Sequence, residues 1–579
     1  MTDLRERAGT DRAAAARSGA TPGPNPEPLA LGRLRTAGLL ALAAVPVLVL
    51  LVLFFYPVAV IVGQGFAGPD GVGALGDVLA RSRIRRIVLF TVWQAAASAG
   101  LCLLLGLPLA HLLYRRRFRG RAVARAVITV PFVLPTVVVG LAFRTLLAEN
   151  GPLGSWGLDG SVWAVLAAHV CLNVAVVVRT VGLAWAGIDD RTADAARSLG
   201  AGPLRVLRTV TLPALGPAIA AAAVMVFLFC ATSFGIMQVL GGGRYSTIET
   251  EIWRQTEEML DLPTASVLSV LQLVLVCAVL VVAARLRRRT ERTLRRRSVR
   301  TPQVGRRDLP AVIVGVLVGL VVLGPVVVMM LRSLRTPGGG WGLQNYRALA
   351  GVGEDNVLLV PVTDALVNSL QSAAVAAAVA IALGAMLAVV LGRRPRSRAG
   401  RRATGLLDAV VMLPLGVSAV TVGFGFLVAL DAPPLDLRSS WLLVPLAQAL
   451  VVTPLVVRML VPLVRSTDDR LRQAAGVLGA PPLTVWRTVD LPLAARGAAG
   501  AAAFAFAVAL GEFGATSFLA RPRTPTLPVV IGRLISRPGE VNAGMALAAA
   551  TVLALLCVLV VAAIDLLGDT RRAGGIGGF

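Results

Sequence analysis

The chain alternates long apolar stretches with short polar ones that are rich in arginine. About 20 consecutive apolar residues in a helix cross the hydrocarbon of a bilayer, and a helix satisfies its own backbone N–H and C=O groups where lipid cannot. The pattern predicts an all-α, polytopic membrane protein with twelve spans, near residues 37–63, 87–113, 124–147, 161–184, 212–240, 264–284, 309–331, 365–391, 406–430, 440–464, 494–520 and 542–565.

Composition supports this prediction, because 56% of the 579 residues are hydrophobic. The net charge of +26 lies in clusters between the apolar stretches, so we expect it to orient the chain in the cell's inner (plasma) membrane and not to bind nucleic acid. All 57 basic residues are arginine. A Walker A phosphate loop needs a lysine, so we expect no such ATPase site in this chain. We expect no catalytic residue and do not expect the chain to be an enzyme.

Arginine clusters follow spans two, six and eight, at residues 115–121, 287–297 and 393–402. The positive-inside rule therefore predicts that both termini are cytoplasmic. It places an acidic segment outside, and two arginine clusters that precede spans two and twelve oppose the rule there. The acidic residues are Glu249, Glu251, Glu257, Glu258 and Asp261, and the opposing arginines are Arg81, Arg83, Arg85, Arg86, Arg521, Arg523, Arg533 and Arg537.

Metal-ligating residue types are scattered. The five cysteines lie singly in apolar stretches, and His111 and His169 stand alone. We expect buried thiols without disulfides, no metal site and no cofactor.

The second half of the chain repeats the first at an offset of 279 residues. Leu134-Pro135 recurs as Leu413-Pro414, Leu199-Gly200-Ala201 as Leu478-Gly479-Ala480, and Phe234-Gly235 as Phe513-Gly514. We expect this register to hold without a gap across spans three to five. Six spans separate equivalent points, so the two halves form a parallel repeat with a pseudo-two-fold axis along the membrane normal.

The repeat predicts two homologous domains of six helices each. Their boundaries are residues 36–286 and 309–567. A disordered cytoplasmic tail (1–35), a basic cytoplasmic linker (287–308) and a short cytoplasmic C-terminal tail (568–579) complete the chain.

The best-matched segment of the repeat joins spans four and five. Asp189 or Asp190 can cap a short helix, Gly200 can end it, Pro203 suits the start of a second short helix, and Pro213 starts the next span. The motif residues are Asp194, Ala195, Ala196, Gly200, Leu212 and Pro213 in the first copy, and Gln473, Ala474, Ala475, Gly479, Leu491 and Pro492 in the second.

These two loops resemble the E-A-A-x-x-x-G-x₉-I-x-L-P signature of permease subunits of binding-protein-dependent ABC importers. The resemblance implies type I permease domains whose loops are coupling helices, each seated on one copy of a cytoplasmic ATPase subunit. It also implies an extracytoplasmic solute-binding protein as partner. The second loop departs from the signature because Gln473 lacks the acidic charge that Asp194 keeps.

The fusion of two domains is similar to the branch that serves thiamine and ferric-iron uptake. The segment from Ser233-Phe234-Gly235 through Gly241-Gly242-Gly243 to Glu249 resembles thiamine permeases in particular. Thiamine is therefore the expected solute, with ferric iron as the alternative. We expect four residues, two at the end of each half's fifth span, to line the path: Ser233, Phe234, Glu512 and Phe513.

Glu512 has two interpretations. It can line the path and attract a cation, or it can merely end its helix near the outer interface. The acidic cluster around Glu249 and Glu251 can attract a cationic solute or form a solvated loop.

Two other classes of function compete with import. A secondary transporter can also have twelve spans in a parallel repeat, but ionisable residues for ion coupling are nearly absent from the predicted span interiors. A membrane scaffold explains neither the duplicated loop nor its position.

Overall fold

The computed structural model describes residues 29–66, 73–288, 302–336, 338–392, 397–431, 436–437, 440–466, 469–485, 487–488 and 491–569. Within these residues the protein is helical, and its only β contacts are isolated bridges. The expected tails 1–28 and 570–579, and linker residues 289–301, lie outside the described part. The first helix already begins at Leu29, inside the stretch predicted as a tail.

The first half contains the spans of the first predicted domain. Its elements are α2 (Leu29–Leu50), η1 (Leu51–Phe55), α3 (Tyr56–Phe66), α4 (Gly73–Ala80), α5 (Ser82–Arg115), α6 (Arg121–Thr129), η2 (Val130–Val133), α7 (Thr136–Leu147), η3 (Gly154–Trp156), α8 (Val162–Ala186), α9 (Arg191–Ser198), α10 (Pro203–Val206), η4 (Leu207–Thr211), α11 (Leu212–Ala231), α12 (Gly235–Leu240), α13 (Ile248–Glu257) and α14 (Leu262–Arg288).

The second half repeats this order. Its elements are η5 (Arg306–Asp308), α15 (Leu309–Ser333), α16 (Gln344–Arg347), η6 (Ala348–Ala350), η7 (Glu354–Asn356), α17 (Val362–Gly392), α18 (Arg398–Gly416), α19 (Ala419–Ala429), α20 (Leu443–Ser466), α21 (Asp469–Val477), α22 (Pro482–Val485), α23 (Leu491–Leu510), α24 (Thr516–Leu519), α25 (Leu527–Ile535) and α26 (Glu540–Asp569). The offset of 279 relates the limits of α11 and α23, and the starts of α10 and α22 and of α13 and α25.

Every predicted span corresponds to a helix or a broken pair of helices. In the described residues, nine helices are long and apolar enough to cross a bilayer alone. Two further spans are bent pairs, Arg121–Val133 with Thr136–Leu147 at 105° and Arg398–Pro414 with Ala419–Ala429 at 87°. The remaining predicted span, 494–520, overlaps α23, whose residues Gly497–Leu510 form a shorter apolar helix. This agrees with the predicted all-α fold of two six-helix domains.

The gapless register is wrong at the third span. The helices after the two bends, α7 and α19, begin 283 residues apart and not 279. Val-Val-Val-Gly at 137–140 therefore matches Val-Thr-Val-Gly at 420–423. Both bends follow a proline, Pro135 and Pro414, but in the second half the helix continues past Pro414 to Gly416 before it stops. A proline inside a helix removes one hydrogen bond without always ending the helix.

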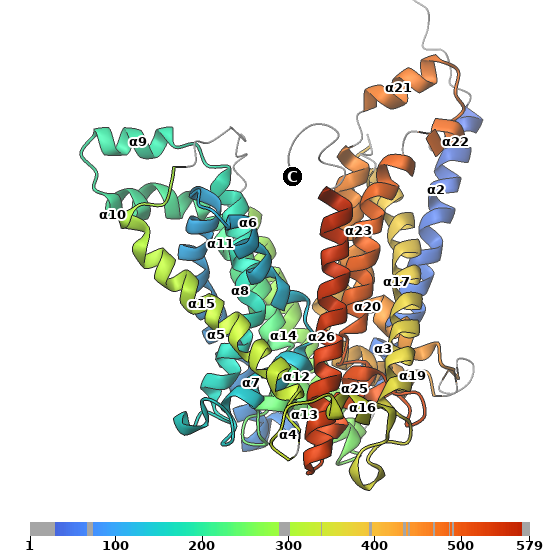
Figure 1. Ribbon diagram of the computed structural model, residues 1–579. Helices are drawn as coiled ribbons and strands as arrows, with labels where there is room; N and C mark the ends of the chain where they lie inside the picture. Colours follow the sequence, from blue (N-terminus) through green and yellow to red (C-terminus); the bar gives the residue numbers. More distant parts are fainter. Residues whose placement is uncertain are drawn as a thin grey trace, which may run out of the picture.

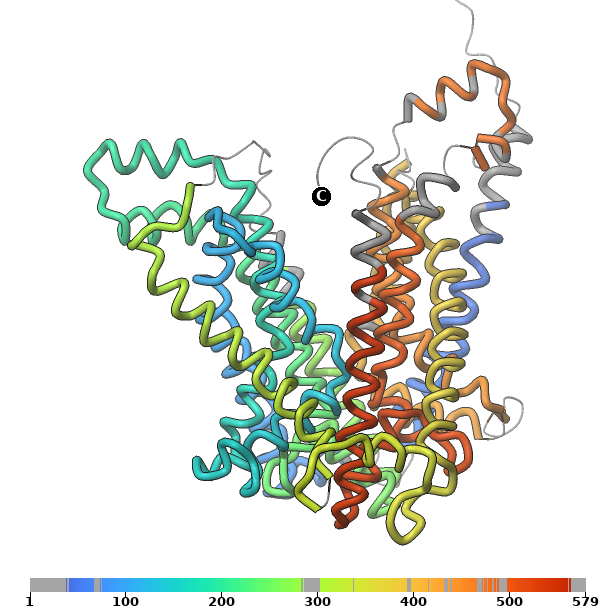
Figure 2. Tube along the Cα trace, viewed as in Figure 1, coloured from blue at the N-terminus to red at the C-terminus, as the bar shows by residue number. Residues whose placement is uncertain are grey.

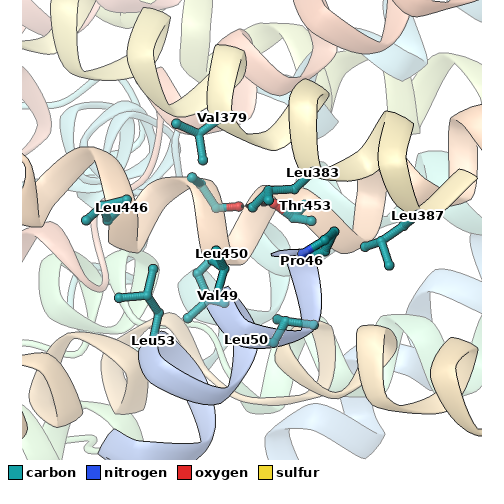
Figure 3. A pocket seen from close by; sticks show the side chains of 11 residues that line it. Pro46, Val49, Leu50, Leu53, Val379, Leu383, Leu387, Leu446, Leu450 and Thr453 are labelled. Atoms are coloured by element: carbon teal, nitrogen blue, oxygen red, sulfur yellow. Dashed lines mark hydrogen bonds between the residues drawn. The ribbon is translucent and has the colours of Figure 1, made fainter. Parts of the chain in front are cut away.

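The first helix of each half packs on the opposite half. Helix α15 lies across α5 and α7, whereas α2 lies against α17. The contact of α2 with α17 and α20 encloses a small apolar cavity of about 10 Å³ (Figure 3), lined among others by Pro46, Leu383 and Thr453. It has room for no more than one water molecule, so it is a packing defect and not a solute site.

Seen from the side, the helices of the two halves diverge toward one end of the molecule and converge toward the other (Figures 1 and 2). Helices α9 and α10 form the tip of one arm, and α21 and α22 form the tip of the other. The short helices α12, α13, α16, α19 and α25 gather at the converging end. The fold thus separates the duplicated loops from the place where the halves meet.

Candidate functional site

The first duplicated loop is built by a glycine turn at the end of α9. Gly200 has φ +83°, and the N–H of Ala201 donates to the carbonyl of Ala196 at 3.0 Å. The N–H of Leu199 donates to Ala195 at 3.1 Å. This is the turn that commonly ends helices with a left-handed glycine. Pro203 then opens α10, which continues through the π-helical turn η4 into α11. The second short helix is therefore part of the next span and not separate from it.

The second loop has the same backbone. Gly479 has φ +79°, and the N–H of Ala480 donates to the carbonyl of Ala475 at 3.0 Å. Pro482 opens α22 as Pro203 opens α10. Leu491 and Pro492 begin α23, as Leu212 and Pro213 begin α11. The positive φ that the sequence predicts at both glycines is confirmed.

Both loops have apolar side chains that the rest of this chain leaves exposed. Leu199 is 89% exposed, and its repeat counterpart Leu478 is 86% exposed. Large apolar groups exposed at equivalent places on two arms are typical of a surface that another protein covers.

Charge distinguishes the two loops. Asp194 is exposed and pairs with Arg197 at 2.7 Å, one helical turn later. Their counterparts, Gln473 and Gly476, carry no charge. The cap predicted for α9 is wrong at Asp190, whose carboxylate instead pairs with Arg115 at the end of α5. The neighbouring Asp189 carboxylate accepts the N–H of Arg191 at 3.1 Å.

The predicted path residues lie where the fifth spans stop, at Ala231 and Leu510. The structure brings Phe234 and Phe513 together across the two halves, with ring centroids 5.2 Å apart and planes at 30°. Ser233, next to Phe234, is buried, and its hydroxyl has no partner among the described residues. The stacked pair lies at equivalent positions of the repeat, so it marks the pseudo-two-fold axis.

Glu512 is a helix cap. Its carboxylate oxygens accept the N–H groups of Ala515 at 2.7 Å and Thr516 at 3.0 Å, at the start of α24. This geometry favours the helix-end interpretation, although the residue is buried beside the stacked rings.

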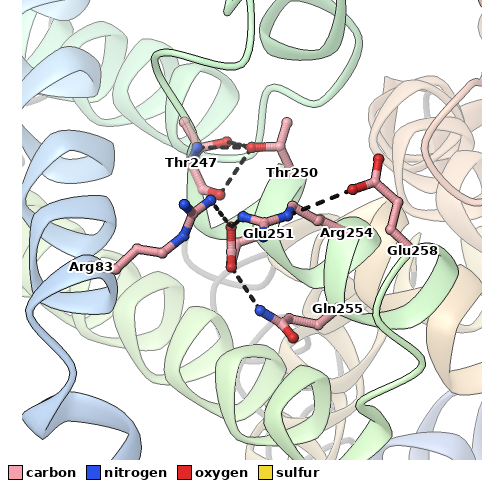
Figure 4. Close-up of polar contacts among 7 residues, drawn as sticks. All are labelled: Arg83, Thr247, Thr250, Glu251, Arg254, Gln255 and Glu258. Carbon is pink, nitrogen blue, oxygen red and sulfur yellow. Dashed lines mark hydrogen bonds and ion pairs between the residues drawn. The ribbon is translucent and has the colours of Figure 1, made fainter.

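Glu249 and Glu251 are buried, contrary to the solvated outer segment that their sequence indicates. They lie in α13, with exposed fractions of 0% and 1%. Glu251 pairs with Arg83 at 3.2 Å and with Arg254 at 3.6 Å (Figure 4). Arg83, whose position opposes the positive-inside rule, therefore has a buried acidic partner. Burial raises the pKa of the nearby Glu257, and the positive charge of Arg533 in α25 acts in the opposite direction.

The family model "Binding-protein-dependent transport system inner membrane component" matches residues 102–292 and again 380–572. The chain belongs to this family. The permease is therefore a polytopic transport subunit of the inner membrane with two family domains in one chain.

Relatives of similar length also contain both domains. The permease is 26% identical over 512 residues to the "Thiamine transport system permease protein ThiP" of Brucella abortus (strain 2308), covering 84% of this chain and 88% of that one. It is 27% identical over 502 residues to the protein of the same name in Escherichia coli (strain K12), covering 84% and 89%. A solved bacterial ABC transporter that imports alginate shares 17% identity at a TM-score of 0.39, covering 45% of this chain and 99% of that one.

Two glutamines near the stacked rings were not identified from the sequence. Gln94 donates to the carbonyl of Cys230 at 2.8 Å, and Gln448 donates to the carbonyl of Ala509 at 3.0 Å. These carbonyls are equivalent in the repeat, but Gln94 lies on α5 and Gln448 on α20, which are not equivalent helices. The sequence did contain a signal for both residues, since each is an isolated glutamine in an apolar stretch.

We predict that Gly200→Val together with Gly479→Val abolishes ATP-driven uptake by the permease. A left-handed backbone costs an L-residue about 1–2 kcal/mol, so valine at these positions should displace both loops. Gly202→Val is the matched control, because Gly202 has φ −65° and an extended backbone that valine adopts readily. Uptake is measured in reconstituted vesicles. Normal uptake by the double variant would show that transport does not depend on the two turns.

Proposed function

We propose that this permease imports thiamine, using two copies of a cytoplasmic ATPase subunit and an extracytoplasmic binding protein. The observation that carries the proposal is the pair of matching loops, each with a left-handed glycine and an exposed leucine, at the tips of the two diverging arms. Family membership supports the use of ATP and a binding protein. No chemistry on the solute is required.

The ATPase subunits dock on the two loops. Leu199 and Leu478 insert into the ATPase surface, and the Asp194–Arg197 pair gives the first loop a charged contact that the second lacks. ATP binding draws the ATPase dimer together and with it the arms. The permease has two arrangements of its arms in this proposal, and ATP can shift the equilibrium between them only if it binds the complex more tightly in one arrangement than in the other. The loops transmit this preference from the ATPase to the arms.

Both termini are cytoplasmic in this proposal. Arg115 and Arg116 end α5 close to the first loop, since Arg115 pairs with Asp190 beside α9. The positive-inside rule then places the diverging end in the cytoplasm and the converging end outside. The described arrangement is thus open toward the ATPase.

The solute is inferred from the relatives whose names specify thiamine, and neither of the two compared above names iron. Thiamine carries a permanent positive charge on an aromatic ring. The stacked phenylalanines at the converging end suit such a solute, because aromatic faces attract cations.

We propose that the binding protein docks on the outer face, and three arginines there support this proposal. Arg144 in α7, Arg332 in α15 and Arg537 after α25 line a cavity of about 490 Å³ where the two halves meet. Arg332 donates to the carbonyl of Asn150, and none of the three forms an ion pair among the described residues. Such a surface is complementary to acidic side chains of a partner.

The solute is tested by uptake into vesicles that contain the permease, its ATPase and its binding protein, with radiolabelled thiamine compared with ferric iron. We expect ATP-dependent thiamine uptake. Iron uptake without thiamine uptake would show that thiamine is the wrong solute but would still support the importer function. Transport by the permease alone, without an ATPase, would instead favour a secondary carrier.

We predict that Arg144→Glu with Arg537→Glu weakens capture of the binding protein, mainly by slowing association. The difference from the unmodified permease should shrink as salt rises, because exposed charges are screened beyond about 10 Å at 0.1 M salt. Arg523→Glu, an exposed charge reversal outside the cavity, is the control. Binding kinetics are measured on permease in nanodiscs. If the control and the double variant bind equally, the cavity is not the docking place.

A further inference from the structure

Glu249 is a buried carboxylate that has no cationic partner among the described residues. It is the second residue of α13, with an exposed fraction of 0%. One oxygen accepts from the amide of Gln272 on α14 at 3.0 Å, and the other accepts from the hydroxyl of Ser418. Its neighbour Glu251, by contrast, pairs with two arginines. A buried carboxylate without a compensating charge is costly.

The contact with Ser418 joins the two halves of the molecule. Ser418 caps α19, since its oxygen accepts the N–H of Val420 at 3.0 Å. Gln272 also donates to the carbonyl of Ala231, the last residue of α11, at 3.4 Å. Gln272 therefore links Glu249 to the end of α11 in the first half, and Ser418 links it to the start of α19 in the second.

The equivalent contact in the repeat lacks these polar groups. Helices α13 and α25 begin at positions related by 279 and are anchored alike. The N–H of Ile248 donates to Thr91 at 3.1 Å, and the N–H of Leu527 donates to Ser369 at 2.6 Å.

Glu249 nevertheless corresponds to Pro528, and the cap residue Ser418 corresponds to Pro135, the residue before α7. Helix α25 packs on α7 as α13 packs on α19. The equivalent positions on the other side of the junction are prolines, so packing alone does not require a carboxylate at Glu249.

Buried polar atoms without partners lie on the segments around Glu249. Among the described residues they include the Gln272 carbonyl oxygen, the Thr421 hydroxyl one turn into α19 and the Ser233 hydroxyl beside the stacked rings. Buried polar groups are normally paired, so unpaired ones at a junction that must open indicate a partner that is not part of the chain.

We propose that Glu249 is the cation-recognition group of the solute path. When the halves separate, its carboxylate leaves Ser418 and pairs with the positive charge of an aromatic organic cation, while Phe234 and Phe513 part to present their faces. In the closed arrangement Ser418 and Gln272 occupy the carboxylate. This inference rests on the proposed import of thiamine and assigns a different carboxylate from Glu512, whose oxygens already accept backbone N–H groups.

The test compares Glu249→Gln with Ser418→Ala in vesicles containing the complete transporter. Glutamine keeps the size of the side chain and one of its two acceptor oxygens but removes its charge. Ser418→Ala keeps the charge and removes the contact between halves together with the cap of α19. We expect Glu249→Gln to lower the rate of thiamine uptake at limiting solute by about tenfold or more, the effect of about 1.4 kcal/mol. Ser418→Ala should change it by less than about threefold, and Glu249→Asp should recover part of the rate.

Glu258→Gln is the matched control, because Glu258 is an exposed carboxylate at the end of the same helix. Co-purification with the ATPase verifies that each variant folds.

Two results would overturn the assignment. Equal losses in Glu249→Gln and Ser418→Ala would make Glu249 a structural contact only. Normal thiamine uptake by Glu249→Gln would exclude it from the path. If the unmodified transporter carries a different cation, thiamine is wrong as the solute while the role of Glu249 still stands. A neutral or anionic solute would overturn the role of Glu249 as well.

Discussion

The structure depends on how backbone groups are satisfied where helices stop inside a membrane protein. The fifth spans end at Ala231 and Leu510, and the bent third spans restart at Thr136 and Ala419. Lipid offers no hydrogen bonds to the groups freed at such breaks, so protein side chains must supply them. Gln94 and Gln448 bind carbonyls near the ends of the fifth spans, and Ser418 and Glu512 bind N–H groups at the starts of short helices.

These breaks let the two halves meet through a few defined contacts. At the converging end these contacts include the stacked Phe234 and Phe513 rings and the bond from Ser418 to Glu249. Each of these contacts is either formed or broken. This suits a solute path that alternates between two arrangements of the halves. The first helices, α2 and α15, cross to the opposite half and pack there.

Much of the fold could be predicted because its determinants are local in sequence. Apolar length predicted the spans, and a repeated glycine predicted the left-handed turns at Gly200 and Gly479. The four-residue shift at the third span was missed because proline weakens a helix without setting where it ends. For Glu249 the sequence left open a solvated loop or a group that attracts a cationic solute, since nothing local distinguishes a polar loop from a short helix folded back between the halves. Its burial follows from contacts with α14 and α19, which are distant in sequence.

The central claim is that motion at the two loops changes the separation of the halves. It is tested most directly with spin labels at Arg208→Cys and Arg487→Cys, equivalent exposed positions near the loops. Electron paramagnetic resonance measures the distance between the labels in the complete transporter, with and without a non-hydrolysable ATP analogue. We expect a clear shift to shorter distances when the analogue binds. An unchanged distance distribution, with the ATPase bound and closed, would contradict the account.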